Sequence, residues 1–263
     1  MEELGIFCSR VLKGEKMKAL LLMPVFRRAK LACNAVACYL AQRLPEDGEA
    51  VLYVLDDGGT FRGLGFTPPV THRVELRRYE RRFPTLATKY SAALDEILPL
   101  EKPDIVLVYE DDDVYLPWHV KVHMEVLRGR RRAWSKPSRV LTDYSGEVKE
   151  EAATGSHGSI AFTADIESRW EALRGKHFDL WFMEGLRGEG GDPLDPMQVY
   201  GKPSYLFRWH TGYYHGQWYM NRPGNYWYEV VEQLAPRPEE ALLVPRFDEF
   251  TVSVLRRYDL GDF

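Results

Sequence analysis

Short apolar runs alternate with helix-like segments through the first half of the chain. The apolar runs predict strands at residues 18–23, 49–55, 72–76 and 104–109. Residues 29–43 are rich in Ala and Leu and predict a helix. A second helix is expected to begin at Pro84, with Leu86, Tyr90, Leu94 and Ile97 on its apolar face. Strands that alternate with helices predict an α/β fold with a doubly wound, mainly parallel sheet.

The second half of the chain has a different pattern. We expect a strand at residues 159–163, a helix at 178–186 and a loop rich in Gly, Pro and Asp at 188–196. Ten aromatic residues lie between Tyr205 and Tyr228, and most of them should pack in a core. From Pro236 the chain is expected to pack back as a tail, which ends in an alternating apolar stretch at residues 250–255. Residues 1–16 are interpreted as an N-terminal arm before a single domain at 17–263.

The acidic sequence Glu110-Asp111-Asp112-Asp113 directly follows the strand predicted at 104–109. Open α/β sheets bind ligands at the carboxyl ends of their strands. Carboxylates crowded there repel one another unless a cation lies among them. On an extended segment Asp111 and Asp113 would face the same way, and Mg²⁺ or Mn²⁺ would suit their oxygen ligands. The alternative is an acidic loop in solvent.

A second acidic pair, Asp56 and Asp57, ends the strand at 49–55 and is followed by Gly58 and Gly59. Short carboxylates at a strand end can accept hydrogen bonds from a ribose hydroxyl or a base imide, and glycines allow a ligand to approach the backbone. The alternative is an Asp-Gly turn or a helix cap.

Four segments together resemble the nucleotide-binding half of GT-A glycosyltransferases, similar to the large family 2. They are Met23-Pro24-Val25-Phe26-Arg27-Arg28, Val54-Leu55-Asp56-Asp57-Gly58-Gly59-Thr60, Leu86-Ala87-Thr88-Lys89-Tyr90-Ser91-Ala92-Ala93-Leu94, and the Asp-x-Asp element within Glu110-Asp111-Asp112-Asp113. Their order and spacing are more specific than any one of them. Tyr90-Ser91 stand where the family usually has an Asn shortly after the Lys.

The resemblance implies a GT-A fold, with the nucleotide-sugar half at residues 17–120 and the acceptor half at 121–263. It also implies that Asp56 and Asp57 contact the nucleoside and that Lys89 approaches the donor phosphates or sugar. Lys89 would otherwise be an exposed helix lysine. The other residues expected to bind the nucleotide-sugar are Pro24, Phe26, Arg28, Asp111 and Asp112. The implied metal, Mn²⁺ or Mg²⁺, would be held by Asp111 and Asp113 and would stabilise the leaving diphosphate.

The acceptor side needs a carboxylate that takes the proton of the attacking hydroxyl. The family tends to place this base at the start of a helix, which favours Asp179, with Glu184 as the runner-up. A helix cap or first-turn acid is the alternative for Asp179. His157, Trp209 and Tyr213 are expected to contact the acceptor, and His215 would complete the metal shell.

Charge and composition limit the partners. The net charge of −4 argues against a protein that coats nucleic acid by bulk electrostatics. Two arginine clusters oppose that charge locally, at residues 73–82 and 128–132, and could form a track for an anionic acceptor such as DNA with a hydroxymethylated base. No apolar stretch approaches the roughly 20 residues that span a bilayer. The N-terminus shows no secretory signal, and three cysteines without a zinc spacing suit the reducing cytoplasm.

These patterns favour a metal-dependent glycosyltransferase that moves a sugar from a nucleoside-diphosphate donor, UDP-sugar in the first instance, to a hydroxyl group. A nucleotidyltransferase would share the sheet and the paired carboxylates, but it commonly needs a glycine-rich loop that Pro24–Lys30 does not offer. A non-catalytic nucleotide- or sugar-binding module is the third hypothesis.

Overall fold

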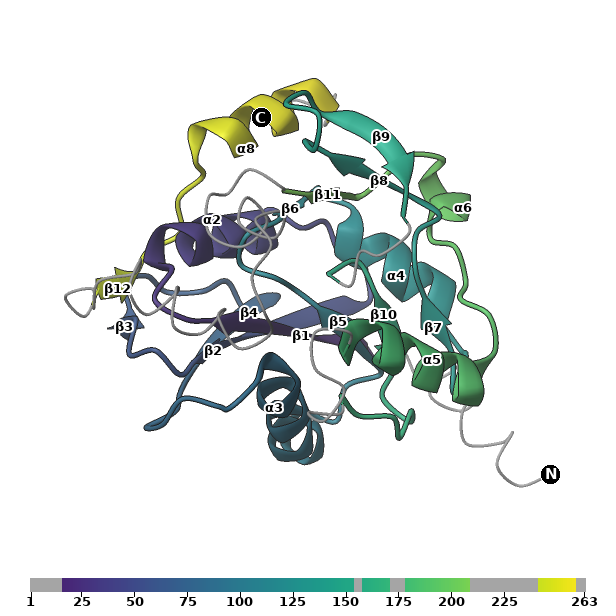
Figure 1. The fold of residues 1–263 in the computed structure, drawn as a ribbon, viewed down its shortest axis with the longest axis horizontal. Coiled ribbons are helices and arrows are strands. Elements are labelled where there is room, and N and C mark those ends of the chain that lie inside the picture. Colours follow the sequence, from purple (N-terminus) through teal and green to yellow (C-terminus); the bar gives the residue numbers. More distant parts are fainter. Residues whose placement is uncertain (1–15, 154–157, 171–177, 209–240, 259–263) are drawn as a thin grey trace, which may run out of the picture.

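The fold is built on a six-stranded sheet in the order β4-β2-β1-β5-β10-β7 (Figure 1). The computed structural model describes residues 16–153, 158–170, 178–208 and 241–258. The strands of this sheet are β1 (Met17–Val25), β2 (Gly48–Asp56), β4 (His72–Arg78), β5 (Ile105–Val108), β7 (Trp134–Ser135) and β10 (Ala161–Thr163). Strands β4, β2, β1 and β5 are parallel, and β10 is antiparallel to both of its neighbours. The doubly wound, mainly parallel sheet predicted from the sequence is confirmed.

Helices cover both faces of this sheet (Figure 1). The helices are α2 (Ala29–Leu40), α3 (Leu86–Glu101), α4 (His119–Leu127), α5 (Phe178–Gly190), α6 (Met197–Tyr200) and α8 (Glu249–Tyr258). Helices α2 and α4 pack on one face, and α3 and α5 pack on the other. Residues of β1 alternate between the two cores, with Leu21 and Met23 in the first and Leu20 and Leu22 in the second. A strand buried on both faces explains why its sequence is a continuous apolar run.

A smaller sheet in the order β6-β11-β8-β9 lies beside helices α2 and α4 (Figure 1). Its strands are β6 (Val114–Tyr115), β8 (Arg139–Thr142), β9 (Lys149–Ala152) and β11 (Tyr205–Phe207). Strand β6 directly follows the acidic segment, so this sheet continues from the carboxyl end of β5. Strands β3 (Phe61–Leu64) and β12 (Ala241–Leu243) form a separate parallel pair.

Three local predictions differ from the structure. The second helix begins after Thr85 and not at Pro84, because Thr85 and Thr88 form a capping box that sets the first turn. Helix α5 runs to Gly190, beyond the loop start predicted at residue 188. The alternating stretch at residues 250–255 lies in α8, where Thr251, Val254 and Leu255 are buried at helical spacing.

Candidate functional site

The acidic residues after β5 form a turn at the carboxyl edge of the main sheet. Strands β1, β2 and β5 run in parallel, so this turn lies at the same edge as the residues that follow β1 and β2. Tyr115 fixes the start of the turn, because its hydroxyl accepts a hydrogen bond from the Glu110 backbone N–H at 2.6 Å. Residues 111–112 are in a turn conformation, so the prediction of an extended segment with Asp111 and Asp113 on one side is wrong.

Glu110, Asp112 and Asp113 instead form a group that fits a divalent cation. Each contributes a carboxylate oxygen, and these oxygens lie within 4.8 Å of one another. The Asp113 carboxylate is held by the Tyr205 hydroxyl, which donates to Oδ2 at 2.5 Å, and by the Arg208 backbone N–H, which donates to Oδ1 at 3.0 Å. Three clustered carboxylates, those of Asp112 and Asp113 buried and that of Glu110 half-buried, are a suitable donor set for Mg²⁺ or Mn²⁺. Of the two predicted metal ligands that the structure describes, Asp113 belongs to this group and Asp111 does not.

Burial makes negative charge costly at this turn. It raises the pKa of Asp113 well above its usual value, and the neighbouring carboxylates of Asp112 and Glu110 raise it further. Burial also raises the pKa of Asp111 to about 7, against the opposing effect of the Arg28 guanidinium. A bound cation would stabilise the ionised carboxylates of the turn.

Asp111 faces the end of β1. Its Oδ1 forms an ion pair with Nη2 of Arg28, and Nη1 of the same guanidinium lies 2.8 Å from Asp112 Oδ2. The Arg28 side chain is only 10% exposed, and Asp111 Oδ2 is buried with no hydrogen-bond partner among the described residues. Arg28, Asp111 and Asp112, all predicted to bind the nucleotide-sugar, are therefore in direct contact.

The second acidic pair is engaged within the protein. Both carboxylate oxygens of Asp56 accept backbone hydrogen bonds, from the N–H groups of Gly58 and Phe61. Asp57 Oδ1 lies 2.5 Å from Nζ of Lys89, and Asp57 Oδ2 accepts a hydrogen bond from the Phe83 N–H. Asp56 thus shapes its own turn, as the alternative interpretation suggested, while Asp57 links the end of β2 to α3.

Lys89 is buried and not an exposed helix lysine. Its side chain is 4% exposed, and Nζ donates to the carbonyl oxygen of Val25 at 3.0 Å as well as pairing with Asp57. Burial lowers the pKa of Lys89, and the Asp57 carboxylate opposes that shift. The lysine therefore connects α3 to the carboxyl ends of β1 and β2, at the edge where the acidic turn lies.

Phe26 follows β1, and two guanidinium groups lie close to its ring. Arg82 lies 4.0 Å and Arg27 5.0 Å from the centre of the Phe26 ring. Pro24, also predicted to contact the donor, is inside β1, where it pairs with Leu55 of β2. Gly58 lies close to this segment, since a Cβ there would come within 3.0 Å of the Arg27 nitrogen.

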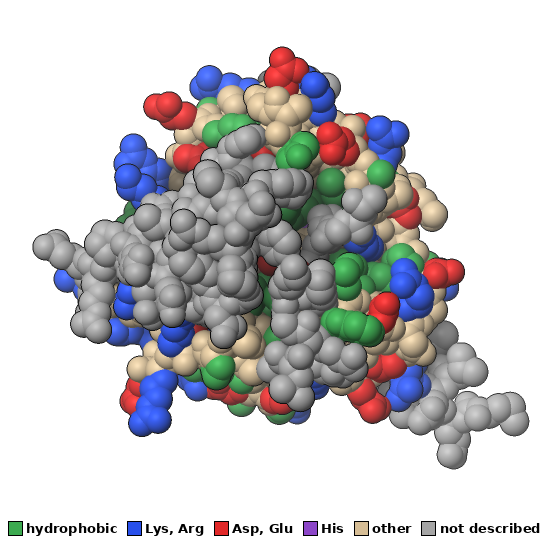
Figure 2. All heavy atoms as spheres, in the orientation of Figure 1, with side chains coloured by type: hydrophobic (Ala, Val, Ile, Leu, Met, Phe, Trp, Pro, Cys, Tyr) green, Lys and Arg blue, Asp and Glu red, His purple; other side chains and the backbone are tan. Residues whose placement is uncertain are grey.

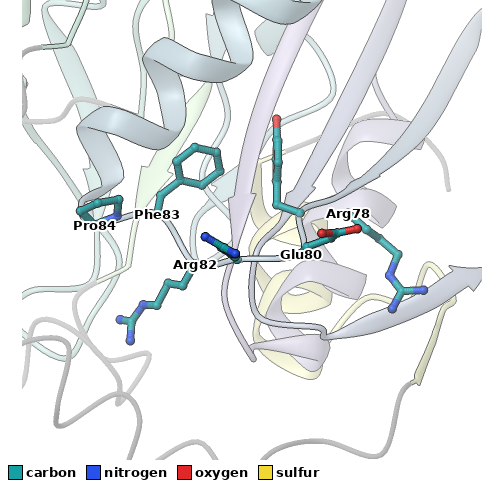
Figure 3. Close-up of a pocket in the computed structure, with 7 residues that line it drawn as sticks. Arg78, Glu80, Arg82, Phe83 and Pro84 are labelled. Carbon is teal, nitrogen blue, oxygen red and sulfur yellow. The ribbon is translucent and has the colours of Figure 1, made fainter.

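A recess of about 600 Å³ opens in the connection between β4 and α3 and is lined by residues 78–84 (Figure 3). Three of its residues are arginines: Arg78, Arg81 and Arg82. Figure 3 shows Phe83 and Pro84 next to the start of α3, while Arg78 and Glu80 lie at the other side of the recess. Because the Phe83 N–H contacts Asp57, this basic recess adjoins the site at the end of β2.

On the acceptor side, the two predicted bases lie in different surroundings. Asp179 is in the first turn of α5 and is half-buried. Its charge raises the pKa of Tyr90, after the larger effect of burial, together with Glu110, Asp111 and Asp112. Asp179 and the acidic turn therefore act electrostatically on the same buried tyrosine, whereas Glu184 is exposed on α5. The predicted residues His157, Trp209, Tyr213 and His215 lie outside the described residues.

Two features of the site were not predicted from the sequence. Tyr205 reaches Asp113 across 92 residues of chain, and no local pattern distinguishes it from the other aromatic residues around it. Gly158 leaves no room for a side chain, because a Cβ there would lie 2.8 Å from the Tyr205 hydroxyl, 3.1 Å from Asp113 Oδ2 and 3.2 Å from Glu110 Oε2. Its place between a predicted acceptor residue, His157, and the strand at 159–163 was the available signal.

Most of the clustered arginines are paired with acids at the surface. The ion pairs that the structure describes are Arg73 with Glu75 and Glu101, Arg77 with Glu96, Arg128 with Asp47, Arg131 with Asp165, and Arg132 with Glu167. Figure 2 shows basic and acidic side chains interspersed around the visible face. The predicted basic track is therefore neutralised at many positions. None of the helices in the described ranges is both long and apolar enough to cross a membrane.

By sequence, the chain matches no known family and no curated protein. By structure, it is similar to S. aureus TarS 1-349 in complex with UDP, with 12% identity and a TM-score of 0.54 over 73% of this chain and 60% of TarS 1-349. The complex of the same protein with UDP-GlcNAc gives 14% identity and a TM-score of 0.54, over 85% of this chain and 68% of the other.

The chain thus spans about three fifths to two thirds of TarS 1-349. At such low identity the likeness establishes the fold and leaves activity open. The chain adopts the GT-A fold of TarS, a family 2 glycosyltransferase, as its four sequence segments indicated.

Proposed function

We propose that the protein is a glycosyltransferase that moves a sugar from a nucleoside-diphosphate donor to a hydroxyl acceptor, with Mn²⁺ or Mg²⁺ at the acidic turn. The observation that carries this proposal is the group formed by Glu110, Asp112 and Asp113 at the carboxyl edge of β5 in a GT-A fold. A nucleotide-sugar bound at this edge would place its diphosphate beside the turn. UDP is the first nucleotide to test, because the structural neighbours are complexes with UDP and UDP-GlcNAc.

The reaction joins the acceptor oxygen to the anomeric carbon of the sugar, and the bond from that carbon to the diphosphate breaks. When bound, the metal supplies positive charge that stabilises the departing diphosphate. Asp113, held by the Tyr205 hydroxyl and the Arg208 N–H, would be one of the residues that hold the metal. Asp179 is the proposed acceptor of the hydroxyl proton, and its half-buried position in the first turn of α5 supports this role over the exposed Glu184.

The nucleoside end of the donor is assigned to the region around Asp57 and Phe26. Lys89 holds Asp57 in place, so we propose that the lysine positions this region and does not itself reach the phosphates. The ring of Phe26 and the guanidinium group of Arg82 would border the base. His157, Trp209 and Tyr213 remain proposed acceptor contacts, and His215 remains a proposed metal ligand.

An anionic acceptor, such as DNA with a hydroxymethylated base, is a narrower version of this proposal. Three arginines line the recess beside Asp57 and motivate this version, while the ion pairs that Arg73 and Arg77 form with acids weaken it. Binding of a DNA duplex should then weaken steeply as salt rises, since phosphate contacts release counterions. If the protein does not bind the duplex, or if its affinity does not change with salt concentration, this version is eliminated.

Calorimetric titration of UDP-GlcNAc and other UDP-sugars, with and without Mn²⁺, tests the main proposal. Wild-type protein should bind one of them only with metal, and D113N should lose this metal-dependent binding while its melting temperature changes little. D192N changes an acid that is 94% exposed and should bind as wild type. Equal binding by D113N and wild type would contradict the site. Release of UDP from the bound donor would separate an enzyme from a non-catalytic binding module.

A further inference from the structure

Arg28 joins the end of β1 to the acidic turn after β5. Its guanidinium contacts two different carboxylates, Asp111 through Nη2 and Asp112 through Nη1 at 2.8 Å. The side chains of Arg28 and Asp112 are each 10% exposed, and that of Asp111 is fully buried. At this degree of burial, a charge-assisted contact is much stronger than an ion pair in water. Arg28 thus neutralises part of the turn from within the protein.

Asp112 belongs to two arrangements at once. It pairs with Arg28, and it is one of the three acids that fit a divalent cation. A dication bound by Glu110, Asp112 and Asp113 would repel the nearby guanidinium and weaken its hold on Asp112. Metal and Arg28 therefore compete for the same negative charge.

The backbone beneath Arg28 is fixed. The Arg27 N–H donates to Thr60 Oγ1 at 2.8 Å, and Gly58 packs against the Arg27 nitrogen so closely that a Cβ would come within 3.0 Å. Arg27 also has φ 55°, a left-handed conformation that is uncommon for residues other than glycine and is held here by these contacts. If the Arg28 guanidinium leaves its carboxylate partners, its side chain would therefore rotate while the backbone of residues 27–28 stays in place.

We propose that Arg28 is an internal counter-cation that occupies the acidic turn in the free protein and transfers to the diphosphate when metal and nucleotide bind together. The planar guanidinium suits phosphate oxygens as well as carboxylates, so the side chain exchanges one anionic partner for another. The metal alone must displace Arg28 without offering it a new partner. Metal and nucleoside diphosphate should therefore strengthen each other's binding, by the same factor in either order. This inference rests on the proposed function.

Titration of Mn²⁺ followed by electron paramagnetic resonance tests the first half of the inference without nucleotide. R28Q should bind Mn²⁺ alone about tenfold more tightly than wild type, because about 1.4 kcal/mol of competition corresponds to one factor of ten. R27Q is the matched control, since Arg27 contacts the Phe26 ring and forms none of the ion pairs described for the acidic turn, and it should bind Mn²⁺ as wild type. R28K keeps the positive charge but lacks the planar guanidinium, so its affinity for Mn²⁺ should lie between those of wild type and R28Q.

Titration of UDP at zero and saturating Mn²⁺ tests the second half. In wild type, Mn²⁺ should strengthen UDP binding by at least tenfold, and in R28Q this factor should fall to about threefold or less. If R28Q binds Mn²⁺ no more tightly than wild type, or keeps the full coupling, the role of Arg28 is overturned while the proposed function stands. If wild-type protein binds Mn²⁺ but binds neither UDP nor UDP-sugars, the proposed function fails, and the transfer of Arg28 to the diphosphate fails with it. If R28Q is poorly folded, R28K supplies the same two comparisons.

Discussion

Replacing Lys89 with methionine should destabilise the fold strongly, although lysines on helices are usually exposed. The side chains of Lys89 and Asp57 are 4% and 5% exposed, and Nζ also donates to the carbonyl oxygen of Val25. K89M would leave the Asp57 carboxylate buried without its cation. Loss of one partner of a buried ion pair costs about 3–5 kcal/mol in unfolding free energy. For a domain of this size, that corresponds to a melting temperature lower by about 6–20 °C.

Urea denaturation of K89M, D57N and the double variant would measure this effect. The double variant should lose less stability than the sum of the single losses, because neither charge is then left buried alone. K121M is the matched control, since Lys121 is 29% exposed and its pairing with Glu125 is worth less than about 0.5 kcal/mol. A K89M protein within about 1 kcal/mol of wild type would refute the ion pair and would favour a lysine that is free to reach a ligand.

Three further predictions concern a glycine in the site, a buried histidine and a glycine in α5. G158A should weaken Mn²⁺ binding about tenfold or more in a calorimetric titration, because its Cβ would displace the Tyr205 hydroxyl from Asp113, whereas G63A meets no atom within 4 Å and should bind normally. Burial lowers the pKa of His123 from 6.5 to about 3. As pH falls, the imidazole is therefore protonated in the unfolded chain before it is protonated in the folded protein. Wild type should lose up to about 5 kcal/mol of stability between pH 6.5 and pH 3 for this reason. Urea denaturation of H123Q at a series of pH values should show a smaller loss of unfolding free energy over that range. The same pH dependence in H123Q and wild type would contradict the lowered pKa of His123. G188A, in α5 with open space around its Cβ, should raise stability by roughly 0.5–1 kcal/mol in the same assay, and a loss would show that α5 is frayed there.

The sequence allowed the main sheet, and the position of the acidic residues at its carboxyl edge, to be predicted. Strands β1 and β5 are buried on both faces, so their residues form unbroken apolar runs that are visible without any tertiary information. The rule that ligands bind at the carboxyl ends of parallel strands then placed the acidic turn and Asp57 at one edge. Both features depend on residues that are close in sequence.

The orientation of individual side chains could not be predicted in the same way. The turn that separates Asp111 from Asp113 is fixed by the Tyr115 hydroxyl, which contacts the Glu110 N–H. Lys89 pairs with Asp57, which lies 32 residues away in the sequence. Asp113 is held by Tyr205, at a separation of 92 residues. Such contacts depend on tertiary packing, which overrides local preferences and leaves no pattern in a single sequence.

A crystal of the protein grown with Mn²⁺ and UDP would test the central claim most directly. Our account predicts an anomalous manganese peak within about 2.0–2.4 Å of oxygens from Glu110, Asp112 or Asp113, with the diphosphate on the opposite side of the ion. The proposed site would be contradicted if manganese and nucleotide bound elsewhere while Arg28 kept its ion pairs with Asp111 and Asp112.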